Sequence, residues 1–239
     1  MSASERLDTV SVSGSIVSVQ VGHVAPLGPR HVPSAFVKRP IAGTVMAKQL
    51  GLVGDQQADL RVHGGPDKAI YCYPIEHYVK WLEERPSSEA LLVPGGFGEN
   101  LTTRGLDEGL VCIGDVLRFS GVTAEVTQPR QPCFKLGLRF EDPKILRDML
   151  RSGRSGWYLR VLEVGLVEAG ASISMIDRPN PSWSVARLNH LFGSRATVEE
   201  LSELAELTGL AAGLRDSARA ALETASVTNR SELPATESN

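Results

Sequence analysis

Apolar and polar residues alternate over several short stretches of the chain, with the two-residue period of a half-buried β-strand. Residues 17–21 read Val-Ser-Val-Gln-Val, and Val122, Ala124 and Val126 alternate with polar neighbours in the same way. The pattern predicts strands over 17–21, 44–47, 69–73, 111–119, 122–127, 158–162, 166–169 and 173–176. Many short strands of this kind are typical of a mainly β body.

Apolar residues spaced three and four apart predict two helices inside this body. Pro74 stands at the start of the first helix, where its missing N–H costs nothing. The apolar face of that helix consists of Ile75, Tyr78, Val79 and Leu82. Asp142 and Pro143 open the second helix as cap and first residue, ahead of four inward-facing apolar side chains.

The pattern changes after the linker-like segment Asp177-Arg178-Pro179-Asn180-Pro181. Three short helices are predicted beyond it, over 184–192, from Thr197 to before Gly209, and over 213–223. The second begins with a capping box of Thr197 and Glu200. The predicted domains are therefore a β domain over 1–178, a three-helix appendage over 182–224, and a disordered tail over 225–239 that is rich in Ser, Thr and Glu.

Composition excludes several classes of protein. The 239 residues include 23 Gly and 14 Pro, which favours many turns over a helix bundle. With 25 basic and 28 acidic residues the net charge is -3, without the basic excess of a nucleic-acid-binding domain. No stretch approaches the roughly 18 apolar residues of a membrane helix. The polar start of the sequence has no signal-peptide core, so we expect a cytoplasmic protein.

The three cysteines, Cys72, Cys112 and Cys133, have neither the spacing of paired metal ligands nor that of a C-x-x-C redox motif. An odd number of cysteines in a cytosolic protein indicates reduced thiols. Cys72 and Cys112 lie within predicted strands, and we interpret both as core residues. Cys133 therefore needs an explanation of its own.

Cys133 lies in the densest group of candidate residues, Gln128-Pro129-Arg130-Gln131-Pro132-Cys133-Phe134-Lys135. Two prolines stiffen the backbone just after a predicted strand. Arg130 and Lys135 flank the cysteine with positive charge, which favours the thiolate. A thiolate in such a loop can act as a nucleophile or as a ligand of a soft metal. A buried, inert cysteine beside surface charges is an equally good interpretation of the residues alone.

A second candidate is the segment Val62-His63-Gly64-Gly65-Pro66-Asp67-Lys68. Adjacent glycines allow backbone N–H groups to point at an anion such as phosphate, and His63 and Lys68 would add donors and charge. A tight turn with a surface histidine explains the same residues. The spacing differs from that of a Walker motif.

The third candidate is Gly95-Gly96-Phe97-Gly98-Glu99-Asn100-Leu101, in which glycines permit a close approach of the backbone. Glu99 and Asn100 offer an acceptor and a mixed donor and acceptor. Asp55, after Gly54, is by default a turn residue. The Gly- and Pro-rich loops at 51–54, 62–66, 94–98 and 128–132 are predicted to wall one pocket.

Taken together and in order, six segments resemble the MOSC domain family, named for the C-terminal domain of molybdenum-cofactor sulfurases, in its YiiM-like stand-alone branch. The resemblance runs from about Ile16 to Ile176. The segments are Gly-Leu-Val-Gly-Asp (51–55), Val-His-Gly-Gly-Pro-Asp-Lys-Ala (62–69), Tyr-Pro-Ile-Glu-His-Tyr (73–78), Phe-Gly-Glu-Asn-Leu-Thr (97–102), Ile-Gly-Asp (113–115) and Gln-Pro-Arg-Gln-Pro-Cys-Phe-Lys (128–135). The helices after the linker resemble the three-helix appendage of that branch.

The resemblance implies a β-barrel-like domain that binds the molybdenum cofactor, a pterin dithiolene with a phosphate, and Cys133 as the protein's ligand to the metal. The residues expected at the cofactor phosphate are Arg130, Lys135, His63, Gly64, Gly65 and Lys68. Asp55, Glu99 and Asn100 are expected to hold the pterin or to deliver protons. The family is also associated with pyridoxal phosphate.

The resemblance further implies an oxidoreductase that reduces N-hydroxylated compounds, such as hydroxylaminopurines and amidoximes, to the amine or amidine. The sequence has no cysteine cluster for an iron–sulfur centre, so a separate reductase is expected to supply electrons. The expected partners are a small N-hydroxylated substrate, this reductase and, for a dimer, a second copy of the chain, without nucleic acid or membrane.

Two other functions fit the same residues. Cys133 could carry sulfur as a persulfide or act as a transferase nucleophile without bound metal. The domain could equally hold the cofactor without turnover. A cysteine hydrolase with His63 as base lacks an identifiable orienting acid.

Overall fold

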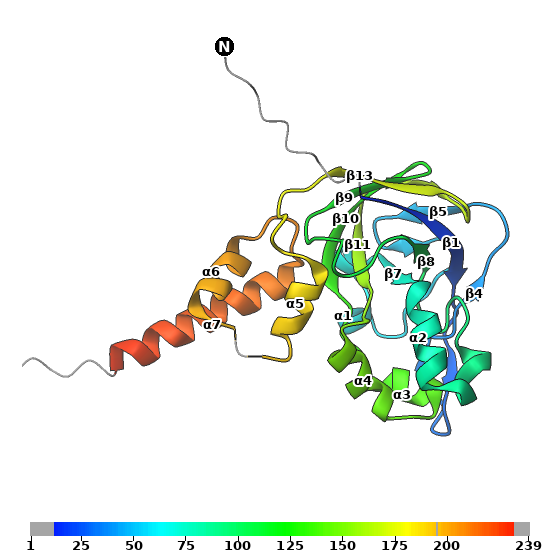
Figure 1. Cartoon of the computed structure of the whole chain (residues 1–239), viewed down its shortest axis with the longest axis horizontal. Helices are drawn as coiled ribbons and strands as arrows, with labels where there is room; N and C mark the ends of the chain where they lie inside the picture. Colours follow the sequence, from blue (N-terminus) through cyan, green and yellow to red (C-terminus); the bar gives the residue numbers. More distant parts are fainter. Residues whose placement is uncertain (1–11, 195, 232–239) are drawn as a thin grey trace, which may run out of the picture.

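The computed structural model of this chain describes residues 12–194 and 196–231. Its centre is a closed barrel of seven strands in the order β13-β9-β10-β11-β7-β8-β1, in which β13 also pairs with β1 (Figure 1). These strands are β1 (Ser13–Val21), β7 (Ile70–Pro74), β8 (Leu101–Arg104), β9 (Val116–Phe119), β10 (Val122–Pro129), β11 (Trp157–Glu163) and β13 (Ser172–Asp177). The expected mainly β, barrel-like fold is therefore confirmed.

Short strands flank the barrel. β4 (Arg39–Pro40) extends it beside β1. A second sheet has the order β12-β5-β6, and a hairpin is formed by two further strands. The bounds are β12 (Gly165–Val167), β5 (Val45–Lys48) and β6 (Gly51–Leu52) for the sheet, and β2 (Ala25–Leu27) and β3 (Val32–Ser34) for the hairpin. Three of these short strands, β2, β3 and β4, lie in the Pro-rich segment 23–40, which has four prolines.

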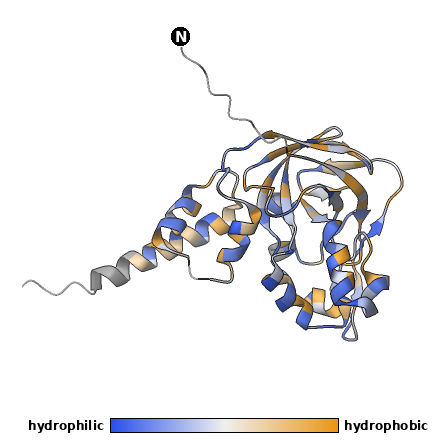
Figure 2. Cartoon of the chain, viewed as in Figure 1, coloured by the Kyte–Doolittle hydropathy of each residue, from blue (hydrophilic) through white to orange (hydrophobic). Residues whose placement is uncertain are grey.

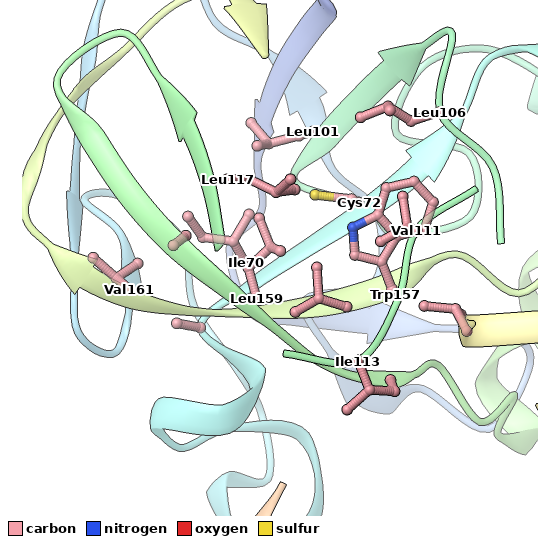
Figure 3. Packing of buried hydrophobic residues seen from close by; sticks show 14 of the residues in the cluster. Ile70, Cys72, Leu101, Leu106, Val111, Ile113, Leu117, Trp157, Leu159 and Val161 are labelled. Carbon is pink, nitrogen blue, oxygen red and sulfur yellow. The ribbon is translucent and has the colours of Figure 1, made fainter. Parts of the chain in front are cut away.

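The two faces of β7 belong to different cores. Ile70 and Cys72 point into the barrel interior, where they pack with residues of the other strands (Figure 3). Tyr71 and Tyr73 belong to a second cluster outside the barrel. Every residue of β7 is buried, because both faces of the strand are covered. Alternate side chains of the strand therefore enter two different apolar clusters.

Four α-helices and two 3-10 helices lie around the barrel. They are α1 (Leu60–His63), η1 (Pro66–Lys68), α2 (Glu76–Glu84), η2 (Pro86–Leu91), α3 (Phe134–Phe140) and α4 (Lys144–Ser152). Pro74 ends β7 instead of opening α2, because it is in parallel register with Thr103 and the next N–H, of Ile75, donates to the Thr103 carbonyl. Figure 2 shows polar and apolar residues on each of α2, α3 and α4.

The helical unit, α5 to α7, follows the linker and projects from one side of the barrel (Figure 1). Its helices are α5 (Val185–Leu191), α6 (Val198–Glu206) and α7 (Ala212–Ser231). The predicted capping box of Thr197 and Glu200 is present. α7 continues to Ser231, beyond the expected end near residue 223, and residues 232–239 of the expected disordered tail lie outside the described residues. None of the described helices is both long and apolar enough to cross a membrane.

Candidate active site

Residues from distant parts of the chain line one cavity beside the barrel. They come from five segments, within 34–38, 55–58, 63–68, 98–100 and 130–135, together with Tyr71 and Tyr158 of two paired strands. The candidate residues that line this cavity are Asp55, His63, Lys68, Asn100, Arg130, Cys133 and Lys135. Three of the candidates, Gly64, Gly65 and Glu99, are not among the lining residues.

Cys133 is the N-cap residue of α3, shortly after the end of β10. Burial by itself would raise the pKa of its thiol. A hydrogen bond from His63, the positive charge of Arg130 and the backbone N–H of Lys135 outweigh this effect and lower the pKa to about 7. The thiolate is therefore a major form at neutral pH, as metal ligation or nucleophilic attack requires.

His63 ends the short helix α1 and hydrogen-bonds the thiol of Cys133. The sequence predicted that the neighbouring glycine turn would cradle a phosphate with His63 as a further donor. In the structure His63 lines the cavity and hydrogen-bonds the sulfur of Cys133, whereas Gly64 and Gly65 do not line the cavity. The expected role of His63 at a cofactor phosphate stays a prediction.

Arg130 is a buried cation in the cavity wall. Its Nη1 donates to the Phe97 carbonyl at 2.9 Å and to the Tyr71 hydroxyl at 3.3 Å. Its guanidinium also lies 4.8 Å from the Tyr71 ring centroid and 5.2 Å from that of Phe36. These contacts fix the guanidinium in place, which presents a preoriented charge to the cavity.

Lys68 and Lys135 also line the cavity. Lys135 donates through Nζ to the Pro33 carbonyl at 3.0 Å, which joins α3 to the β2–β3 hairpin. Lys68 follows the 63–65 turn, and partial burial lowers its pKa against the opposing charge of Asp67. Both side chains line the cavity, where an anion would meet their positive charge.

Asp55 lies in the cavity wall with both carboxylate oxygens engaged. Oδ1 accepts from the Gly22 N–H at 2.7 Å and from Lys38 Nζ, and Oδ2 accepts from Asn100 Nδ2 at 2.9 Å. Burial lowers the pKa of Lys38, which Asp55 opposes. Asn100 is further held by the Tyr71 N–H, which donates to its Oδ1 at 3.1 Å. Asp55, Lys38 and Asn100 thus form one connected polar cluster.

Glu99 is a buried internal acceptor that does not line the cavity. Its Oε1 accepts from the Tyr78 hydroxyl at 2.5 Å, the Gly95 N–H at 2.8 Å and the Thr102 hydroxyl at 2.8 Å. Its Oε2 accepts from the Phe97 N–H at 3.2 Å. The carboxylate closes the glycine-rich loop, and the expected role toward a ligand does not follow from this position.

Sequence reasoning missed several residues of the cavity wall, among them Phe36, Lys38, Tyr71 and Tyr158. Lys38 lies in the Pro-rich segment, and its partner Asp55 comes from a turn 17 residues away. Tyr71 and Tyr158 are paired across β7 and β11, with ring centroids 5.3 Å apart. Both strands were predicted, but alternation does not reveal which strands are neighbours.

The charges of the described lining residues favour an anionic ligand. Four side chains are cationic, Lys38, Lys68, Arg130 and Lys135, whereas Asp55 is the one carboxylate among them. This excess lies in a chain whose net charge is -3. A ligand with a phosphate would find both charge and donors here.

Within 12–194 and 196–231, no group of three or more His, Cys, Asp or Glu side chains is arranged to hold a metal ion. Cys133, which lines the cavity with a lowered pKa, is a candidate protein ligand to a metal that a cofactor would bring. The molybdenum cofactor, with its dithiolene and phosphate, fits this donor set.

Known protein families match both parts of the chain, the β domain and the helical unit. The MOSC domain matches residues 59–174, and the YiiM-like 3-alpha helix domain matches residues 183–225. The protein YiiM of Escherichia coli (strain K12) is 43% identical over 63% of this chain and 67% of its own length. A protein named "Reductase" from Gibberella moniliformis is 38% identical over 86% of this chain, which spans 37% of that longer protein.

The crystal structure of YiiM from Geobacillus stearothermophilus superposes with a TM-score of 0.74 at 33% identity, and covers 87% of this chain and 99% of that one. The barrel and its cysteine-bearing loop thus define the class, and the chain belongs to the MOSC domain family. Its helical unit and its relatives place it in the YiiM-like branch. That family is associated with functions related to the molybdenum cofactor.

Proposed function

We propose that the protein is a molybdenum-dependent reductase that binds the molybdenum cofactor in this cavity and reduces N-hydroxylated compounds to amines or amidines. The observation that carries the proposal is Cys133, a cavity-lining thiol whose pKa is lowered to about 7 and whose surroundings carry an excess of cations. A relative named "Reductase" supports the reaction type.

Each part of the cavity has a role in this proposal. Cys133 is the ligand to the metal, and His63 orients its sulfur. Arg130, Lys68 and Lys135 bind the cofactor phosphate, since all three are cationic and line the same cavity. Asn100 holds Asp55, and the Asp55–Lys38 pair is the group that holds a proton at the cavity wall.

The reaction balances as R–NHOH with two electrons and two protons giving R–NH₂ and water. When bound, the molybdenum centre supplies the two-electron chemistry, and the chain supplies binding, orientation and protons. A separate reductase is the proposed electron source, because the sequence has three cysteines and two of them are buried in the core.

The test is metal analysis of the full chain, expressed in cells with intact cofactor synthesis, for wild type and Cys133→Ala. We expect molybdenum close to one per chain in wild type and at least a tenfold loss in the variant, because the protein's bond to the metal is removed. Cys72→Ala is the matched control and should retain the metal, since Cys72 lies in the barrel interior.

Reduction of a hydroxylaminopurine, with an added electron donor, then separates the alternatives. Cofactor retained without reduction would support a binding module that lacks turnover. No molybdenum in wild type, together with a persulfide on Cys133 after treatment with a sulfur donor, would instead support a sulfur carrier. Unchanged molybdenum in Cys133→Ala would contradict the ligand assignment.

A further inference from the structure

Asp67 joins three parts of the chain just behind the cavity. Its Oδ1 accepts from Arg160 of β11, through Nε at 2.9 Å and Nη2 at 2.6 Å. Its Oδ2 accepts from the backbone N–H of Ala212, the first residue of α7, at 2.8 Å. Its backbone carbonyl accepts from the Thr127 hydroxyl of β10 at 2.6 Å. Asp67 itself does not line the cavity.

The residues next to Asp67 do line the cavity. Lys68 follows it directly, and His63, which hydrogen-bonds Cys133, lies four residues before it. The loop is short and ends in the 3-10 helix Pro66–Lys68, so a shift of Asp67 would move both side chains. The contacts of Asp67 therefore fix the wall that faces Cys133.

The start of α7 is itself held firmly on the barrel. The Ala211 N–H donates to the Thr127 carbonyl at 3.1 Å. Gly209 packs so closely that a Cβ there would lie 2.5 Å from Gly114 Cα and 2.8 Å from Glu125 Oε1. Glu125 also accepts from Arg160 Nη1 at 2.5 Å. The barrel, the α6–α7 turn and the cavity loop thus share one set of contacts.

We propose that the helical unit is a supporting part of the site, and that Asp67 is the positioning residue through which the start of α7 holds the His63–Lys68 loop in place. The first N–H groups of a helix have no partner inside it, and a carboxylate there meets both donors and the positive end of the helix dipole. The effect of this contact on catalysis rests on the proposed function. The coupling between the start of α7 and the His63–Lys68 loop does not depend on it.

The sharpest test compares Ala212→Pro with Ala212→Gly in the full chain. Proline removes the N–H that donates to Asp67 but is tolerated at the first position of a helix, and the preceding Ala211 is not helical. Glycine keeps that N–H and serves as the conservative variant. Hydrogen–deuterium exchange is measured at the amides of His63 and Lys68, which are bonded to the Asp59 and Gly65 carbonyls.

We expect exchange at these two amides to be about tenfold faster in Ala212→Pro and close to wild type in Ala212→Gly, because a charge-assisted hydrogen bond is lost in the first variant alone. Amides of β10 should be unchanged in both. Equal exchange in the two variants would overturn the proposal.

A second pair of variants covers the case in which the proline disturbs folding. Asp67→Asn turns an amide NH₂ toward one of the two donor residues, Arg160 or Ala212. The control is Glu203→Gln, which removes a carboxylate of the helical unit that accepts from Trp183 and Arg187. Faster exchange at His63 and Lys68 is expected in Asp67→Asn alone. The same increase in Glu203→Gln would show a general loosening and would also overturn the proposal.

The two proposals fail separately. Exchange is measured without cofactor, so an unchanged loop would contradict the coupling whatever the protein binds. Lack of molybdenum in wild type would contradict the proposed function and leave the coupling intact. If both hold, Ala212→Pro retains less molybdenum than Ala212→Gly.

Discussion

The barrel interior and the cavity each hold a cysteine, and the pKa values of the two thiols are shifted in opposite directions. Cys72 lies in the barrel interior, where burial raises the pKa of its thiol and the charge of Glu99 raises it further. The cavity holds Cys133 and Asp55, and the pKa of Cys133 is lowered to about 7. The difference comes from the donors around each group and from access to the cavity, since the chemistry of the side chains is the same.

Arg130 shows how closely the two regions adjoin. Its guanidinium contacts the Phe97 carbonyl, in the loop that Glu99 closes, and its charge lowers the pKa of Cys133. Tyr71, on the outer face of β7, accepts from the same guanidinium, whereas its neighbour Cys72 points into the barrel. One strand therefore separates an inert thiol from a reactive one.

The largest expected difference is in alkylation. At pH 7.5 we expect iodoacetamide to modify Cys133 at least about 1,000-fold faster than Cys72, because the thiolate is the nucleophile and Cys72 is both protonated and enclosed. Mass spectrometry of the native protein over time measures both rates, with Cys112, also buried, as an internal control. Comparable alkylation rates at Cys72 and Cys133 would contradict the predicted difference in reactivity between the two thiols.

The carboxylates give the next effect. Glu99→Gln should lower the free energy of unfolding by about 1–3 kcal/mol, because an amide nitrogen replaces an oxygen that accepts from buried donors. Glu76→Gln is the control, since Glu76 accepts a single exposed N–H, from Gly105, and should change stability by less than about 1 kcal/mol. Urea denaturation measures both changes.

The rate of Cys133 alkylation should stay unchanged in Glu99→Gln. A variant of normal stability that retained molybdenum but lost reduction would restore the role in proton delivery that the sequence predicted for Glu99, and would argue against its internal placement.

The sequence predicts what local patterns encode. Alternation at Val122, Ala124 and Val126 gives β10, and the spacing of Thr197 and Glu200 gives the start of α6. The motif that contains Cys133, Arg130 and Lys135 predicts these three residues as part of the site.

Contacts between distant segments are not encoded in this way. Nothing local indicates that Lys38 meets Asp55 or that His63 reaches the sulfur of Cys133, because both contacts depend on how the barrel closes. The resemblance implies a role for Glu99 at the ligand, and nothing in the sequence indicates that the N–H groups of Gly95 and Phe97 donate to its carboxylate.

The smallest expected effect isolates the histidine that distinguishes the two cysteines. In His63→Phe the ring is kept but the donor to the sulfur is lost, so the pKa of Cys133 should rise by about one unit from its value near 7. The pH dependence of Cys133 alkylation in cofactor-free protein measures this shift. The rate falls as the pH drops through the pKa, because the thiolate becomes protonated, and it levels off above the pKa.

His190→Phe is the control, since His190 is exposed in the helical unit and should leave the midpoint near 7. Arg130 and the Lys135 N–H remain in His63→Phe, which is why the midpoint should stay below that of Cys72. An unchanged midpoint in His63→Phe would assign the reactivity of the thiol to Arg130 and the backbone N–H alone. The cavity would then differ from the interior through fixed charge, and His63 would be free to bind the phosphate that the sequence first suggested for it.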